Sequence, residues 1–394
     1  MSQSPTPVTE ILRTSPLIDG HNDLPWEARK QVGYDFDRLD IAAGTQGRTH
    51  TDVPRLRAGG VGGQFWSVFV PAQLQGDSAV SATLEQIDAV HQMVGRYPDA
   101  FGIARTADEI EAVFDSGRIA SLMGAEGGHS IGCSLATLRM MYVLGVRYLT
   151  LTHNDNVPWA DSATDEPVHH GLSRFGVEVV HEMNRTGMLV DLSHVSADTM
   201  RDALKATEAP AIFSHSSARA VCDSPRNAPD DVLETLRDNN GVIMATFVPE
   251  FVSQACAAWR QSAVDAAAAA GLAPFDLSQF APFVKEWMVR NPRPASGLAD
   301  VVPHFEHIRE VCGIDHIGIG GDYDGTGALP TGLEDVSGYP VLFAALQEKG
   351  WSDDDLRKVA GGNVLRVMRD AEAKARELQA TRGPSLATYE ELDG

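Results

Sequence analysis

Eight short apolar runs are spaced along the chain, and stretches with the apolar spacing of an amphipathic helix separate them. The runs are rich in β-branched residues, do not alternate with polar residues, and are bounded by Gly, Pro or Asp, which is typical of buried parallel strands. Several intervening helical patterns end in Gly, a common helix stop. The eight runs are Leu17–Asp19, Gln64–Val70, Ile119–Gly124, Arg147–Thr152, Met188–Leu192, Ala211–Ser214, Val242–Phe247 and His316–Gly320.

Eight strands that alternate with helices predict an α/β fold of the (β/α)8, TIM-barrel type, with long loops and a C-terminal helical extension. A doubly wound open sheet is the alternative, and the count of eight favours the barrel. We expect one metallo-dependent hydrolase domain over residues 1–394, since a single barrel can reach this size. Its additions are an N-terminal extension (1–15), a polar loop (27–58), a helical insertion (249–312) and a C-terminal helix and tail (352–394) that opens at a capping Ser352.

Composition narrows the classes of partner. The formal net charge of −22 argues against a nucleic acid, which needs clustered Lys and Arg. The four cysteines are dispersed and form no CxxC pair, which favours a reducing compartment over a disulfide scaffold. The sequence shows no signal-peptide pattern, no run of 18 apolar residues and no apolar C-terminal tail. We therefore expect a cytoplasmic protein that does not bind a membrane.

Ionisable side chains follow the proposed strands at one end. The first strand is followed by DGHND, in which the two-residue spacing of His21 and Asp23 places both side chains on one face. The carboxyl ends of all barrel strands meet at one rim, where the active sites of such barrels lie. The other candidates at this rim, each from a different strand, are Glu126, His153, His194, His215 and Asp322.

A metal centre explains these ionisable residues at one rim better than separate structural roles for each residue do. A lone His at a strand end is more often a hydrogen-bonded loop residue, and a lone Asp or Glu is more often a helix cap. Seven such residues at equivalent positions would crowd buried charges that need a counter-charge. Imidazole and carboxylate without thiolate favour zinc over manganese, cobalt or iron. The donors outnumber what one ion needs, so we expect two Zn²⁺ ions with Glu126 as the bridging carboxylate.

Six motifs closely resemble the membrane (renal) dipeptidase family of zinc metallopeptidases. They occur in the family's order from about residue 16 to the GGNVLRV stretch at 361–367. The resemblance implies a two-zinc barrel that hydrolyses dipeptides with metal-activated water, including dipeptides with a C-terminal D-residue. The motifs are DGHNDLPW (19–26), EGG (126–128), LTHNDNVPWADS (151–162), DLSHVS (191–196), FSHSSARAVCDSPRNAPDD (213–231) and GGDYDG (320–325).

The resemblance also implies metal ligands. His21 and Asp23 would hold one zinc, His194 and His215 the other, and Glu126 would bridge both. Asp322 would lie beside the first metal, where we count it among the ligands and as the general acid/base.

The remaining roles concern the substrate. His153 would polarise the scissile carbonyl and stabilise the oxyanion, and Arg226 would bind the terminal carboxylate in a bidentate contact. Phe251 stands where a relative has a pocket-lining Tyr, and Trp26 completes the predicted substrate-binding set.

Two further expectations concern identity and assembly, and two alternative functions remain. Ala72 and Asp155 occupy the places of two cysteines that form a disulfide in secreted relatives, which favours an intracellular, bacterial member of the family. The resemblance suggests a homodimer. Two other functions stay open: another binuclear-metal amidohydrolase, such as a lactonase or phosphodiesterase, and an inactive barrel that serves as a binding scaffold.

Overall fold

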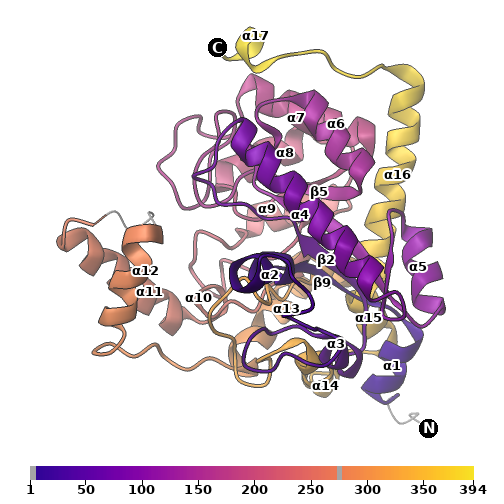
Figure 1. The fold of residues 1–394 in the computed structure, drawn as a ribbon, viewed down its shortest axis with the longest axis vertical. Helices are drawn as coiled ribbons and strands as arrows, with labels where there is room; N and C mark the ends of the chain where they lie inside the picture. The colour runs from indigo at the N-terminus through magenta and orange to yellow at the C-terminus, as the bar shows by residue number, and fades with distance from the viewer. Residues whose placement is uncertain (1–5, 273–276) are drawn as a thin grey trace.

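A closed parallel barrel forms the centre of this computed structural model, which describes residues 6–272 and 277–394 (Figure 1). Eight strands pair in the order β1-β2-β4-β5-β6-β7-β8-β9 and return to β1. A further strand, β3, pairs with residues 119–121 of β4 outside this ring. The strands are β1 Leu17–Asn22, β2 Val61–Ser67, β3 Phe101–Ile103, β4 Ile119–Glu126, β5 Val146–Thr150, β6 Leu189–Asp191, β7 Ile212–Phe213, β8 Val242–Ala245 and β9 Ile317–Ile319.

Each of the eight predicted runs overlaps one barrel strand, so the predicted (β/α)8 fold is confirmed. The largest shift in bounds is in β2, which begins at Val61 and includes two glycines. A side chain at Gly62 would lie 2.8 Å from Pro16, which is why this strand begins without an apolar pattern. β3 was not predicted, because three residues are too few to show a periodicity.

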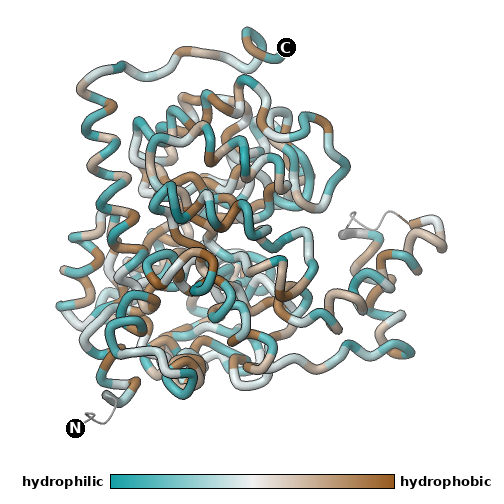
Figure 2. The backbone as a smooth tube through the Cα atoms, turned by 180° about the vertical axis from the view of Figure 1, so that it is seen from behind, coloured by the Kyte–Doolittle hydropathy of each residue, from teal (hydrophilic) through white to brown (hydrophobic). Residues whose placement is uncertain are grey.

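Helices follow most of the strands and cover the barrel. They are α1 Val8–Thr14, α2 Leu24–Val32, α3 Val53–Ala58, α4 Asp77–Arg96, α5 Ala107–Asp115, α6 Leu135–Leu144, α7 Arg174–Thr186, α8 Ala197–Ala206, α9 Asp230–Asp238, α10 Pro249–Val252, α11 Gln254–Ala269, α12 Leu277–Trp287, α13 Leu298–Cys312, α14 Tyr339–Glu348, α15 Asp353–Arg357, α16 Asn363–Thr381 and α17 Tyr389–Leu392. In Figure 2 apolar residues gather towards the middle of the molecule, while the outer turns carry many polar residues.

The segment predicted as a polar loop at 27–58 is partly helical. Helix α2 begins after Asp23, has Pro25 in its first turn, and buries Leu24, Ala28 and Val32. A proline in the first turn costs no backbone hydrogen bond, and the i, i+4, i+8 spacing places the three apolar side chains on one face. The prediction was therefore wrong at both ends, since α3 also occupies residues 53–58.

The predicted insertion at 249–312 holds four helices, of which α11 and α12 project from the barrel as an arm (Figure 1). Ala263, Ala267 and Phe280 form a small apolar cluster between these two helices. Residues 273–276 of the insertion and 1–5 of the N-terminal extension lie outside the described residues.

The C-terminal helical extension is present and closes the amino-end floor of the barrel. Ser352 caps α15 as predicted, accepting a hydrogen bond from the backbone N–H of Asp355. A π-helical turn over residues 358–362 then leads into α16. Val364 and Met368 share an apolar cluster with Ile18 of β1 and other interior side chains. The floor is therefore filled, and the opposite, carboxyl end carries the loops.

Close packing of three strands shapes the carboxyl end. A side chain at Gly20 would lie 2.4 Å from the carbonyl oxygen of Ser214, and one at Gly320 would lie 1.9 Å from it. Only glycine allows β1, β7 and β9 to approach this closely. The residues that follow these three strands are brought together as a result.

Candidate metal centre

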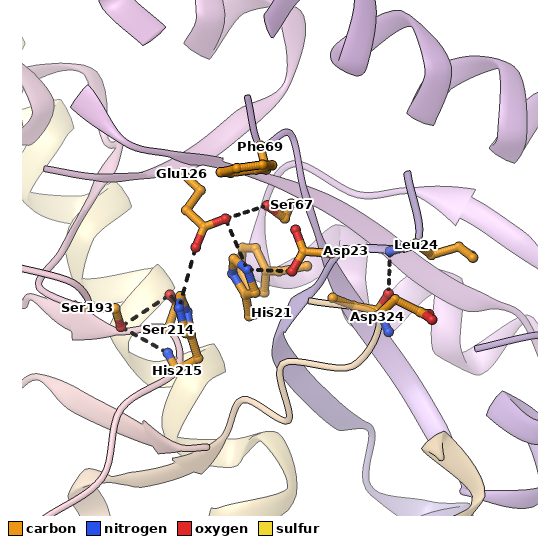
Figure 3. A network of polar contacts seen from close by, with 12 residues as sticks. His21, Asp23, Leu24, Ser67, Phe69, Glu126, Ser193, Ser214, His215 and Asp324 are labelled. Carbon is orange, nitrogen blue, oxygen red and sulfur yellow. Dashed lines mark hydrogen bonds and ion pairs between the residues drawn. The ribbon is translucent and has the colours of Figure 1, made fainter. Parts of the chain in front are cut away.

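Glu126, the last residue of β4, lies at the centre of a buried cluster of imidazoles (Figure 3). Its Oε2 lies 3.5 Å from Nε2 of His21, and its Oε1 lies 3.0 Å from Nε2 of His194 and 3.5 Å from Nε2 of His215. Nε2 of His153 lies 3.8 Å from the same Oε1. One carboxylate therefore faces imidazoles at the carboxyl ends of four different strands, as the sequence predicts.

Two aspartates join the cluster beside His21. Oδ2 of Asp23 lies 3.2 Å from Nε2 of His21, and His21, Asp23 and Asp322 each offer a ligand atom within 4.8 Å of the others. A side chain at Gly325 would meet Asp322 at 2.2 Å and Asp23 at 2.3 Å. The glycine of GGDYDG thus leaves room for both carboxylates.

The backbone at two of these residues is strained. His194 and Asp322 have φ values of 68° and 60°. Non-glycine residues seldom adopt this left-handed conformation, and where they do they often belong to functional sites. The strain aims both side chains into the cluster.

Hydrogen bonds fix the tautomers of two imidazoles. The Tyr148 hydroxyl donates to the Gly20 carbonyl at 3.0 Å, so its contact of 2.9 Å with Nδ1 of His21 is one in which the imidazole donates. The Ser214 hydroxyl donates to Asp191 at 2.6 Å and accepts from Nδ1 of His215 at 2.8 Å. Both rings therefore carry a proton on Nδ1 and direct Nε2 into the cluster, which is the orientation in which an imidazole binds a metal.

Burial sets the protonation preferences of the centre. It raises the pKa of Glu126, and it raises that of Asp322 well above its usual value, with Asp23 and Glu126 adding to the shift of Asp322. Burial and the charge of Arg226 hold the pKa of His194 and His215 well below the ordinary range. The neutral imidazoles of His194 and His215 beside crowded acids are suited to divalent cations, which would favour the ionised carboxylates.

The donor set fits a metal. Within the described residues, Nε2 of His21 is buried and makes no hydrogen bond of good geometry, although the Asp23 carboxylate lies 3.2 Å away. A buried polar atom without a partner is costly, and a cation bound there would satisfy it. Three overlapping groups could hold an ion, and they share Glu126 or His21: His21–Glu126–His215, Glu126–His153–His194 and His21–Asp23–Asp322.

Arg226 lies close enough to the cluster for its charge to affect Glu126 and Asp322. The residue is 3% exposed, and none of its three guanidinium nitrogens has a hydrogen-bond partner among the described residues. Burial lowers its pKa to about 10, so it stays charged at neutral pH. Its guanidinium carbon lies 5.0 Å from the centroid of the Phe251 ring, at the start of the insertion. This arrangement suits an anionic group of a ligand.

Aromatic rings line one side of the centre. The His153 ring lies between the ring of Phe69, at 4.8 Å between centroids, and the ring of His194, at 4.5 Å. Trp26 makes an edge contact with Phe69 at 5.2 Å. Trp26, Phe69 and His153 are each partly exposed. The structure thus places every predicted site residue in or beside one cluster.

Sequence reasoning missed the supporting residues, of which Tyr148, Asp191, Ser214 and Phe69 are the main ones. Asp191 and Ser214 stand in the DLSH and FSHS motifs, so position beside a candidate ligand was an available signal. Tyr148 lies inside an apolar run, and no sequence pattern distinguishes it from a core residue.

The membrane dipeptidase family, peptidase family M19, matches residues 6–382. The chain belongs to this family. The suspected resemblance is therefore confirmed over nearly the whole sequence, and the family assignment makes the chain a metallopeptidase.

Solved structures share this fold over most of the chain. Dipeptidase AC, a metallopeptidase of family M19, is 26% identical with a TM-score of 0.75, over 91% of this chain and 99% of that one. The probable dipeptidase PvdM from Pseudomonas aeruginosa is 23% identical with a TM-score of 0.81, over 93% and 98%. A metallopeptidase from Rhodobacter sphaeroides, bound to a phosphinate mimic of L-Ala-D-Ala, is 24% identical with a TM-score of 0.75, over 91% and 99%.

No helix in the described part of the chain is long and apolar enough to cross a membrane.

Proposed function

We propose that the chain is a zinc-dependent dipeptidase that holds two Zn²⁺ ions. The observation that carries the proposal is the Glu126 carboxylate, which faces His21 with one oxygen and His194 and His215 with the other. A carboxylate with donors on both sides suits a pair of cations about 3.5–4 Å apart. His21 and Asp23 would hold the first ion, His194 and His215 the second, and Asp322 would lie at the first.

When bound, two such cations would polarise the scissile carbonyl and lower the pKa of an attacking water towards about 7. The residues supply proton transfer and orientation. Asp322, whose pKa is raised, is suited to take a proton from the water and deliver it to the departing amine. His153 would donate a hydrogen bond to the carbonyl oxygen as negative charge develops there.

Arg226 would bind the carboxylate of the C-terminal residue, since its unpartnered nitrogens match a bidentate acceptor. The separation between this cation and Glu126 would set the length of the substrate, so a dipeptide fits and a longer peptide does not. Phe251, beneath Arg226, and Trp26, beside Phe69, would line the pocket.

The proposal includes dipeptides whose C-terminal residue has the D configuration. Support comes from the Rhodobacter sphaeroides relative, which is liganded with a mimic of L-Ala-D-Ala. The two competing functions are less well supported. One buried arginine offers little for a phosphodiester, and an inactive scaffold would have no need for a complete donor set with fixed tautomers.

A cytoplasmic location and a single domain complete the proposal. The four cysteines are free in the described structure, which suits a reducing compartment.

The test is hydrolysis by the zinc-loaded chain of an L,L-dipeptide, an L,D-dipeptide, the matching tripeptide and an N-blocked dipeptide, each with and without a chelator. We expect cleavage of both dipeptides, little cleavage of the others, and loss of activity with the chelator. Equal cleavage of di- and tripeptides would contradict the dipeptidase assignment. Activity that survives metal removal would contradict the role of zinc.

A further inference from the structure

The His153 ring differs from the other imidazoles of the centre in how it is held. His21 and His215 are each fixed by a hydrogen bond at Nδ1, from the ring to Tyr148 and Ser214 respectively. Among the described residues, Nε2 of His153 lies 3.8 Å from Oε1 of Glu126, a distance that exceeds hydrogen-bond length. The orientation of this ring therefore depends on what packs against its faces.

Two rings make that contact. The Phe69 ring lies 4.8 Å from His153 at an interplanar angle of 55°, and the His194 ring lies 4.5 Å away at 32°. His194 is itself a candidate ligand and has its own place at Glu126. Phe69, in contrast, has no proposed contact with a metal. Figure 3 shows its ring beside Glu126 at the edge of the cluster.

The position of Phe69 is well defined by its neighbours. Its carbonyl oxygen accepts a hydrogen bond from the side chain of Gln86 at 2.8 Å, and the edge of its ring packs against Trp26. Ser67, two residues earlier, ends β2 and donates to Oε2 of Glu126 at 3.2 Å. The hydrogen bonds of Ser67 and of the Phe69 carbonyl thus hold the segment after β2 in place. A substitution of the Phe69 side chain removes the ring contact with His153 and leaves these two hydrogen bonds intact.

We infer that Phe69 is a positioning residue, which holds the His153 ring so that its N–H faces the carbonyl oxygen of the substrate. The inference rests on the proposed function, because it assigns a task to His153 in that reaction. Tilted aromatic pairs attract each other beyond simple burial, and this attraction favours one orientation of the His153 ring over the others. A small displacement of a catalytic group can lower the rate by about 100-fold.

Substitutions at Phe69 separate this task from simple packing. F69L keeps an apolar side chain and removes the ring, whereas F69Y keeps the ring. We expect kcat for a dipeptide to fall by about 10- to 100-fold in F69L and by less than about 3-fold in F69Y, with KM little changed in both. Phe101, a buried ring of β3 that contacts Trp66, provides the matched control, and F101L should keep kcat.

A double-mutant cycle identifies the partner through which Phe69 acts. In an H153A background the residual activity should be nearly the same with Phe69 or Leu at position 69, because the group being positioned is gone. An equal loss in both backgrounds would overturn the inference. So would a change confined to KM that follows the size of the substrate side chain, since that result would make Phe69 a pocket wall.

A structural measurement decides the inference even if no dipeptide is hydrolysed. Crystal structures of the wild type and F69L should show the His153 ring in one orientation in the former, and rotated or in several orientations in the latter. An unchanged His153 ring in F69L would refute the positioning role. Absence of dipeptide hydrolysis by the wild type would instead refute the proposed function.

Discussion

Nε2 of His194 and Nε2 of His215 lie 3.0 Å apart, and both lie near the same oxygen of Glu126. The proton of His215 is on Nδ1, where Ser214 accepts it, so its Nε2 faces His194 as a lone pair. Burial keeps the pKa of both imidazoles well below the ordinary range. Two imidazole nitrogens and a carboxylate oxygen that converge in this way could hold a cation, and a bound ion would join them.

Tyr148 should control metal affinity through His21. Y148F removes the acceptor that fixes the His21 tautomer, and loss of such an outer partner lowers metal affinity by about 10- to 100-fold. Competition with a chelating dye would measure this change. Y142F is the control, because Tyr142 packs against Arg147 at 4.1 Å away from the cluster. Wild-type affinity in Y148F would show that the hydroxyl does not orient His21.

Asp322 should be needed for proton transfer more than for metal binding. We expect D322N to lower kcat by about 100- to 10,000-fold and to keep most of the metal, because an amide cannot accept the proton. D324N is the matched control: Asp324 lies two residues away, and its Oδ1 accepts a hydrogen bond from the backbone of His50 at 2.6 Å, which an amide oxygen can also do. Steady-state kinetics with metal analysis would measure both variants. Near-normal turnover in D322N would contradict the role.

Arg226 should matter for the substrate carboxylate and not for folding. R226M removes a buried charge that has no hydrogen-bond partner in the described structure and keeps an apolar side chain against Phe251, so the melting temperature without substrate should not fall. The catalytic efficiency kcat/KM for a dipeptide should fall by about 100-fold or more, the cost of leaving a buried carboxylate unpaired. A dipeptide amide should show little difference between wild type and variant. An equal loss of kcat/KM on the dipeptide amide would show that Arg226 does not act on the substrate carboxylate.

His304 should make stability depend on pH. Burial lowers its pKa to about 4 from the ordinary 6.5, and the neutral ring accepts from the Ala218 N–H and donates to the Val252 carbonyl. Between these values the unfolded chain binds a proton that the folded chain does not, so stability falls as the pH is lowered from about 6.5 to about 4.

H304Q should remove this contribution, up to about 1.4 kcal/mol per pH unit, because glutamine can make both hydrogen bonds without titrating. Urea unfolding at several pH values would measure it. Identical pH slopes for wild type and H304Q would exclude a contribution from His304.

Much of the site could be predicted because its candidate ligands lie at the ends of strands, and an apolar run in the sequence predicts each strand. His21, Glu126 and His215 were found this way. The supporting contacts could not be predicted, because they join residues distant in sequence: Tyr148 reaches Gly20 and His21 across the barrel interior. A tyrosine in an apolar run is indistinguishable from core until the barrel closes.

The fold shows the same limit. Strand β3 depends on its pairing with β4, and the bounds of α2 depend on its packing against β2 and α4. Local sequence patterns therefore did not reveal them. The glycines of β2 removed the apolar signal at the point where the strand begins.

Zinc titration of the metal-stripped chain, with dipeptide hydrolysis followed at each addition, tests the metal centre most directly. The arrangement around Glu126 predicts no activity without metal and a rise that saturates at about two zinc ions per chain. Full activity in the stripped chain, or failure to bind zinc at saturating concentration, would contradict it.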